Sequence, residues 1–170
     1  MKRVLQFSGA ISLALAAVAF ILMLVTNAVI VGSGQFQVVY PGTYAIFGHK
    51  AEGLLDVTYN PSVLALIGWI LALVGMVVVL LGVVLPLLKV KGVEKFAGLM
   101  NLCAVVCFVL AGIFMFLVVP TFFAANDSDV PSNAAIGAGW VIGGIVFMVA
   151  GGFAILPAAV DFFGKKKKRR

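Results

Sequence analysis

Four long apolar runs, none of which contains a charged residue, constrain the fold more than any other feature of this sequence. A helix needs about 20 apolar residues to cross the ~30 Å hydrocarbon core of a bilayer, and every run reaches that length. Only 11% of the 170 residues are charged, whereas soluble domains are about one quarter charged. The sequence therefore predicts an all-α integral membrane protein, a single four-span domain over 1–170 that forms a four-helix transmembrane bundle. The spans are expected at about 4–29, 63–88, 98–119 and 135–160.

The first run follows Lys2 and Arg3, so a cleaved signal peptide is the alternative to a membrane span. The apolar part of a signal peptide is usually about 7–15 residues long and precedes a small-residue cleavage site. This run is much longer and has no persuasive cleavage site. An uncleaved span is the favoured interpretation.

Eleven of the twelve Lys and Arg residues lie on one side of the predicted bundle. Two precede the first span, three lie in the loop at 89–95 and six form the tail, whereas the loops on the other side contain Lys50 alone. Lys and Arg concentrate in the cytoplasmic loops of membrane proteins. The pattern therefore predicts that both termini are cytoplasmic, and the compact loops suit a bacterial cytoplasmic membrane.

The basic tail, residues 164–170, has three interpretations. It anchors the topology, it attracts anionic lipid headgroups at about 1 kcal/mol per basic residue or less, or its Lys167-Lys168 pair acts as a retrieval signal in a eukaryotic cell. The anchor is favoured, with the lipid attraction added to it. Because the positive charge is confined to the ends of apolar runs, no nucleic-acid partner is expected. The proposed anchor residues are Lys165, Lys166, Lys167, Lys168, Arg169 and Arg170.

The longest loop between predicted spans, residues 32–62, has a strand-like pattern. Apolar side chains recur at every second residue from Phe36 to Tyr40, which is typical of a half-buried strand. Pro41-Gly42 favours a turn, because Pro presets φ and Gly tolerates positive φ. We expect a small antiparallel β element in this first extracytoplasmic loop, packed on the helix ends, since two or three strands are marginally stable alone. The strands are expected at 35–40, 43–47 and 54–59, with a polar loop at 48–53 and no strand at 121–134.

The aromatic side chains of that loop suit packing on the helices or the headgroup belt. A patch that binds a ligand or a partner is the alternative.

Small residues recur at helical spacing in the predicted spans, which lets helix backbones approach closely in lipid. The first span has Ser8, Ser12 and Ala16 at spacings of four. The fourth has Gly139 and Gly143 in a GxxxG arrangement. This pair either packs against the same chain, which is the favoured interpretation, or forms a dimer face. The candidate helix-packing residues are Gly68, Ala72, Gly75, Gly82, Gly139 and Gly143.

No residue set typical of catalysis or metal binding is visible. Ionisable residues inside spans mark transport paths or proton relays, and the four runs contain none. Cys103 and Cys107 share a helix face without a third ligand nearby, and His49 is the single histidine, so no zinc site is expected. Packing is favoured over palmitoylation of Cys103, and Asn126 begins a glycosylation triplet whose use is not expected. We expect no catalytic residue, no cofactor and no metal.

Four spans, internal termini and a strand-bearing first outer loop resemble the layout of claudin-type tetraspan proteins. The first outer loop of that family contains a Trp, a Gly-Leu-Trp motif and a pair of Cys. This loop contains neither residue type, and Trp69 and Trp140 lie within predicted spans. The resemblance therefore implies a layout and no residue roles.

The favoured function is that of a non-enzymatic structural or accessory integral membrane protein, acting through helix–helix or outer-loop contacts. Its expected partners are the lipid bilayer, anionic headgroups at the basic tail, and a second copy or another membrane protein. The alternative is a small transporter or channel subunit whose path forms only in an oligomer. A charged or water-filled interior would favour transport, and a dry bundle would favour the accessory role.

Overall fold

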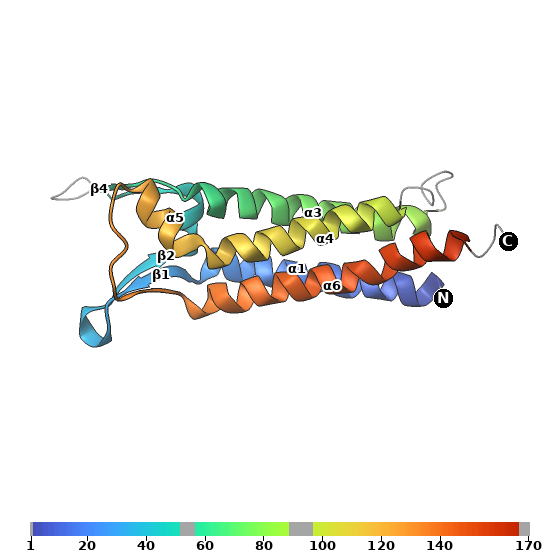
Figure 1. The fold of residues 1–170 in the computed structure, drawn as a ribbon, viewed down its shortest axis with the longest axis horizontal. Coiled ribbons are helices and arrows are strands. Elements are labelled where there is room, and N and C mark those ends of the chain that lie inside the picture. The colour runs from blue at the N-terminus through green and yellow to red at the C-terminus, as the bar shows by residue number, and fades with distance from the viewer. Residues whose placement is uncertain (1, 52–56, 89–96, 167–170) are drawn as a thin grey trace.

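The computed structural model describes residues 2–51, 57–88 and 97–166 of the chain. Four long helices run side by side in an elongated bundle, and short strands gather at one end of it (Figure 1). We call this the sheet end, and the opposite end, where the first helix begins and the last one ends, the terminal end. The long helices are α1 (Lys2–Val25), α3 (Val63–Leu87), α4 (Ala97–Phe116) and α6 (Ala138–Lys166).

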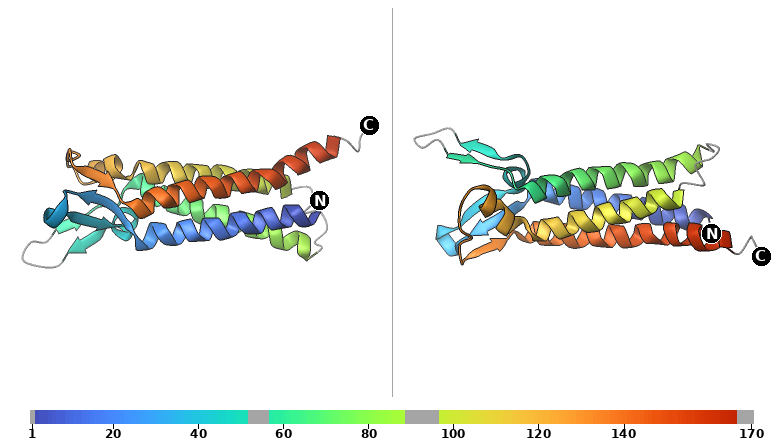
Figure 2. Two further views of the ribbon diagram at one scale, coloured as in Figure 1. Left: turned by 90° about the horizontal axis from the view of Figure 1, so that it is seen from below. Right: turned by 45° about the horizontal axis from the view of Figure 1, so that its top comes forward.

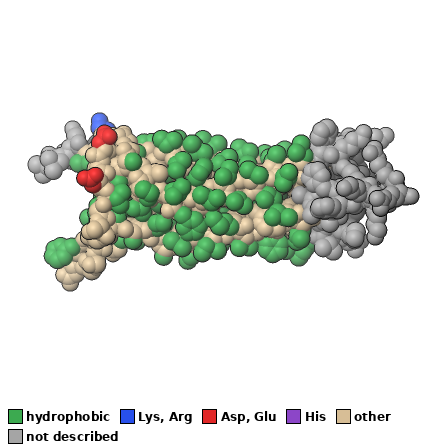
Figure 3. Space-filling view, viewed as in Figure 1, with side chains coloured by type: hydrophobic (Ala, Val, Ile, Leu, Met, Phe, Trp, Pro, Cys, Tyr) green, Lys and Arg blue, Asp and Glu red, His purple; other side chains and the backbone are tan. Residues whose placement is uncertain are grey.

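The described residues include four helices that are long and apolar enough to cross a membrane, which confirms this part of the predicted fold. Large apolar side chains cover the bundle between its two ends (Figure 3). The charged side chains that are coloured in that view lie at the sheet end. The apolar stretches of the helices are Phe7–Val25, Val63–Leu85, Gly98–Phe116 and Ala138–Leu156.

Three of the predicted spans have wrong bounds at the sheet end. The first does not continue to 29, because strand β1 (Asn27–Val31) follows α1. The third does not continue to 119, because a separate helix, α5 (Val118–Ala125), follows α4. The fourth does not begin at 135, because strand β5 (Ala134–Ile136) precedes α6. A short apolar strand and an apolar helix end look alike in a sequence, so hydrophobicity alone could not separate them.

The strands β2, β1 and β5 form an antiparallel sheet in that order, so the segment after α1 pairs with the segment before α6. β2 covers Val38–Pro41, and Ile30 of β1 lies opposite its Val39. A second antiparallel sheet pairs β3 (His49–Ala51) with β4 (Val57–Tyr59) and projects from the same end of the bundle (Figure 2). The small antiparallel element predicted from the sequence is therefore present.

Within the first loop, the predicted strands are only partly right. Residues 43–47 form a helix, α2 (Gly42–Phe47), and not a strand, so the chain does not turn back at Pro41. The predicted polar loop at 48–53 contains β3, and of the predicted strand 54–59 the residues 54–56 lie outside the described residues. Thr, Tyr, Ile and Phe favour strands in isolation. Here α2 buries Ala45 and Ile46, and that packing decides the conformation. The predicted absence of strands at 121–134 is also wrong, because β5 begins there.

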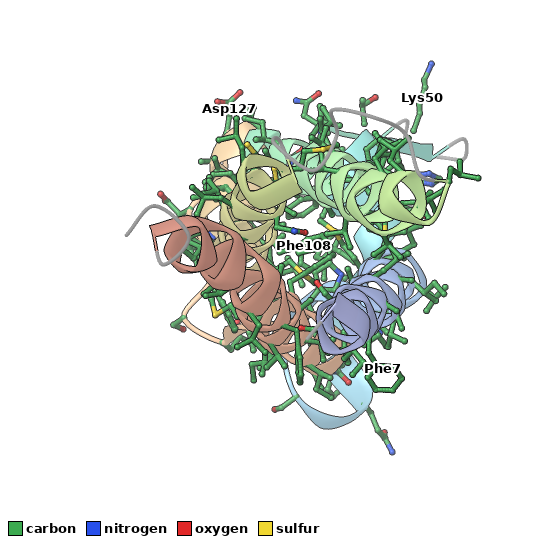
Figure 4. The ribbon with its side chains drawn as sticks, turned by 90° about the vertical axis from the view of Figure 1, so that its right-hand side faces the viewer. Phe7, Lys50, Phe108 and Asp127 are labelled. Atoms are coloured by element: carbon green, nitrogen blue, oxygen red, sulfur yellow. The ribbon has the colours of Figure 1, made fainter. Side chains whose placement is uncertain are left out.

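Apolar side chains fill the interior of the bundle. Phe108 of α4 points into the centre between the four helices (Figure 4), and its ring stacks on Phe147 of α6 with the centroids 6.1 Å apart. Helix α6 packs against both α4 and α1, and α3 packs against α4. Phe7 points away from the bundle and is exposed, as expected for a side chain that faces lipid.

Candidate interaction surface at the sheet end

The helix-packing candidates of α3 face α4. A methyl group added to Gly68 would lie 3.3 Å from Cβ of Phe114, and one added to Gly75 would lie 2.6 Å from the ring of Phe108. Ordinary carbon contacts are about 3.5–4.0 Å, so neither site has room for a larger side chain. The remaining two candidates of α3 are Ala72, which is fully buried, and Gly82, which faces Asn101 of α4.

The two candidates of α6 face other helices of the same chain. A methyl group added to Gly143 would lie 2.9 Å from Cε of Met115 and 3.5 Å from the backbone oxygen of Ala19. One added to Gly139 would overlap the side chain of Thr26. Both glycines of the GxxxG arrangement are therefore in contact with α4 or the end of α1, and not with an open face.

One close helix contact was not foreseen from the sequence. A methyl group added to Gly112 of α4 would lie 2.7 Å from the backbone oxygen of Gly144 of α6. In the sequence, Gly112 stands alone in the middle of the predicted third span. No small residue lies four positions before or after it, so no small-residue pattern marks it as a helix contact.

Two serines connect α1 to α6. The hydroxyl of Ser8 donates to the backbone oxygen of Phe153 at 2.6 Å, and that of Ser12 donates to the backbone oxygen of Ala150 at 2.7 Å. Both serines are buried. Hydrogen bonds of this kind hold helices together in lipid, where apolar side chains give no net drive to associate.

The last turn of α1 is capped by the sheet end. Thr26 donates its hydroxyl to the backbone oxygen of Leu22 at 2.6 Å, and Trp140 donates its Nε1 to the backbone oxygen of Met23 at 3.1 Å. The backbone N–H of Gly42 donates to the backbone oxygen of Thr26 at 2.8 Å. A helix end leaves four carbonyls without partners inside the helix. The bond from Trp140 gives the Met23 carbonyl a partner that the helix does not supply, and the bond from Gly42 fixes α2 against the residue that follows α1.

Asparagine side chains join the two loops of the sheet end. Asn126 accepts a hydrogen bond from the backbone N–H of Asn60 at 2.7 Å, and its Nδ2 donates to the backbone oxygens of Asn60 and Phe122 at 3.2 and 2.8 Å. Nearby, the hydroxyls of Ser62 and Thr121 lie 2.6 Å apart. A glycan on Nδ2 of Asn126 would remove one of its two donor hydrogens, so this geometry opposes glycosylation.

An aromatic cluster lies between these loops and the first sheet. The ring of Tyr40 lies 5.4 Å from that of Tyr59 and 5.1 Å from that of Phe122. Burial, and then the neighbouring Tyr59, raises the pKa of the Tyr40 phenol above its ordinary value. His49 stacks on Tyr44 with centroids 3.9 Å apart and ring planes 8° apart. Aromatic pairs of this kind stabilise packing, which agrees with the packing role predicted for these rings.

The β1–β2 hairpin carries an exposed apolar tip. Gly32 and Gly34 have φ of 93° and 65°, in the left-handed region that favours glycine. The turn that they form leads into a short 3-10 helix, η1 (Gly34–Phe36), and places Phe36 at the tip with its side chain 90% exposed. Val38 and Val39 of the edge strand β2 are 52% and 44% exposed. We call Phe36, Val38 and Val39 the hairpin patch; it lies on the projecting hairpin at the lower left of Figure 1.

The hairpin patch is apolar and uncharged. Residues 4–49 contain no charged side chain, so none lies on either strand of the hairpin. At the same end Lys50 and Asp127 point away from the bundle (Figure 4). The sequence pattern predicted Phe36 as one of the inward residues of a half-buried strand, and that is wrong, because the chain at Phe36 has left the strand.

The predicted chemistry-bearing residues are not brought together. Among the described residues, no group of three or more His, Cys, Asp or Glu side chains lies close enough to hold a metal ion. Cys103 and Cys107 are free thiols on α4, the first exposed and the second half-buried. Of the proposed anchor residues, Lys165 and Lys166 end α6, and Lys167 to Arg170 lie outside the described residues.

No model of a known protein family matches the chain, and no curated protein matches it.

Proposed function

We propose that the chain is a non-enzymatic structural or accessory protein of a membrane, which presents the hairpin patch to another membrane protein. The observation that supports this most is the exposure of Phe36, 90% of whose side chain is open at the hairpin tip. Exposed apolar groups that gather on one projection are typical of interaction sites, and an edge strand offers unpaired backbone groups to a partner. A hairpin without charge favours a partner that offers an apolar surface.

The transport alternative has less support. Among the described side chains, the buried polar ones are Ser8, Ser12, Ser62 and Asn101. Three of these are serines whose hydroxyls bond within the chain. A path for ions or charged substrates usually contains ionisable groups inside the spans, and the four apolar runs have none.

We further propose that the sheet end faces the outside and the terminal end the cytoplasm, where the basic tail anchors the chain and attracts anionic headgroups. The proposal rests on the eleven basic residues at the terminal side of the runs. In a background with Cys103→Ala and Cys107→Ala, a cysteine in place of Ser128 should react with a membrane-impermeant thiol reagent added outside. A cysteine in place of Lys91 should react only after the membrane is opened. The reverse pattern would refute the orientation.

The hairpin patch is tested by photo-crosslinking in native membranes. A photoreactive phenylalanine analogue in place of Phe36 should crosslink to a second membrane protein. The same analogue in place of Val130, which is 48% exposed at the same end, should not. Phe36→Ser should weaken partner binding by roughly thirtyfold or more, since an aromatic hot spot contributes about 2 kcal/mol or more.

The melting temperature of Phe36→Ser should stay that of the wild type, because the side chain has little contact to lose. Equal crosslinking at both positions, or an unchanged partner recovery with Phe36→Ser, would contradict the proposal.

A further inference from the structure

The indole N–H of Trp69 in α3 lacks an acceptor. Among the residues that the structure describes, its Nε1 is the one buried side-chain nitrogen or oxygen without a hydrogen-bond partner. The indole of Trp140, by contrast, donates to the backbone oxygen of Met23 at 3.1 Å. Buried indole N–H groups usually find a partner. Because Trp140 has an acceptor within the chain and Trp69 has none, the acceptor for Trp69 is expected outside the described residues.

Trp69 lies near the sheet end and its side chain leans towards that end. It follows the first residue of α3, Val63, by six positions, which is about 9 Å along a helix axis. Helical side chains lean towards the N-terminus of their helix, and α3 begins at the sheet end. The contact with Phe47, the last residue of α2, agrees with this direction: the two rings meet edge to face, with centroids 5.1 Å apart.

The indole also lies at the side of the bundle and not in its centre. Phe20 of α1 stacks on it from one side, with centroids 6.0 Å apart. Phe47 is 51% exposed, and the neighbouring Ile67 and Ile70 of α3 are 39% and 46% exposed. In a bilayer, these exposed groups face lipid. Nε1 itself is buried, so a lipid reaches it only if a neighbouring side chain moves, and Phe47 is the half-exposed ring in contact with the indole.

A single neutral donor among apolar side chains suits a neutral oxygen acceptor. Where the hydrocarbon core meets the headgroups, the bilayer supplies such oxygens as the ester carbonyls of its glycerophospholipids. We propose that Trp69 is a lipid-binding residue, whose N–H donates to one ester carbonyl of a phospholipid in the seam between α1, α2 and α3, with Phe47 as a movable cover. The proposal rests on insertion of the four helices in a bilayer, and not on a partner at the hairpin patch.

The test compares two lipids that differ in that carbonyl. The full chain, with ¹⁵N-labelled tryptophan, is placed in nanodiscs of a diester phosphatidylcholine and of the diether analogue with the same chains. Trp69→Phe assigns the two indole N–H signals. The Trp69 signal should lie further downfield in the diester lipid, whereas the signal of Trp140, which bonds within the chain, should stay in place. Trp140 is thus an internal control.

Three outcomes overturn the proposal. The Trp69 signal could be the same in both lipids, which would show that no lipid carbonyl accepts its hydrogen bond. Phe47→Leu could abolish the difference between the lipids, which would show that the difference comes from the ring of Phe47 and not from a carbonyl bonded to Nε1. A chain that enters neither kind of disc would refute insertion and, with it, the lipid site. A difference between the lipids that persists in Phe47→Leu supports the proposal.

Discussion

Gly42→Ala is expected to separate the sheet end from the bundle and to destabilise the protein more than a substitution at a helix contact such as Gly143→Leu. The new methyl group would overlap the backbone oxygen of Met23 and lie 2.8 Å from Nε1 of Trp140. The overlapped atom belongs to a backbone, so it cannot swing away as a side-chain end would. We expect a loss of at least ~3 kcal/mol, the upper end of the usual range for overpacking. Thermal unfolding in detergent would measure it.

The matched control for that substitution is Gly152→Ala. Gly152 lies in α6 with no atom within 4 Å of its added methyl group, so the change should be neutral or stabilise the helix by up to ~1 kcal/mol. The φ of Gly42 is not in the left-handed region, so the expected cost is steric and not conformational. Equal melting of Gly42→Ala and the wild type would show that α2 does not approach α1 this closely.

Gly143→Leu is expected to weaken the bundle itself, by about 1–3 kcal/mol. The leucine would have to displace Met115 of α4 and would press on the backbone of Ala19 in α1, since the first methyl group already lies 2.9 Å from Cε of Met115. A lowered melting temperature in detergent would report the loss. Gly152→Leu adds the same bulk to the same helix where nothing lies within 4 Å, so it should leave the melting temperature close to that of the wild type.

Crosslinking of the same two variants separates packing within one chain from packing between chains. Loss of a crosslinked dimer with Gly143→Leu, without a change in melting, would mean that the glycine belongs to an interface between two copies. Equal behaviour of Gly143→Leu and Gly152→Leu in both measurements would mean that Gly143 is not part of a helix contact.

The four helices could be predicted from the sequence because length and apolarity are sufficient for a membrane-spanning helix. The residues at which these helices end could not be predicted in this way. The run from Ala28 to Val31 is as apolar as the helix before it, and only its pairing with β2 and β5 makes it a strand. Residues 43–47 are predicted as a strand that returns after a turn at Pro41-Gly42, but a strand there would not bury Ala45 and Ile46 against the bundle.

The candidate sites show the same limit. Spacing along one helix identified Gly143, but a close approach depends on what lies opposite, and Gly112 had no pattern of its own to mark it. The exposure of Phe36 depends on the backbone at Gly32 and Gly34, which turns the chain out of its strand. The alternating pattern predicts the same burial for Phe36 and Tyr40. In the structure, Phe36 lies at an open tip and Tyr40 lies within an aromatic cluster.

The order of strands β2, β1 and β5 has a consequence for how the chain is made. β1 and β2 lie between the first two helices, whereas β5 immediately precedes the last one. During synthesis, β1 can pair with β2 early. Its other edge stays unpaired until residues 134–136 reach the same end of the bundle. Completion of the sheet therefore requires that α4 and α5 have been made and that the segment before the last helix has reached the sheet end. A chain arrested after α5 would keep that edge of β1 unpaired, where a quality-control protease or chaperone could recognise it.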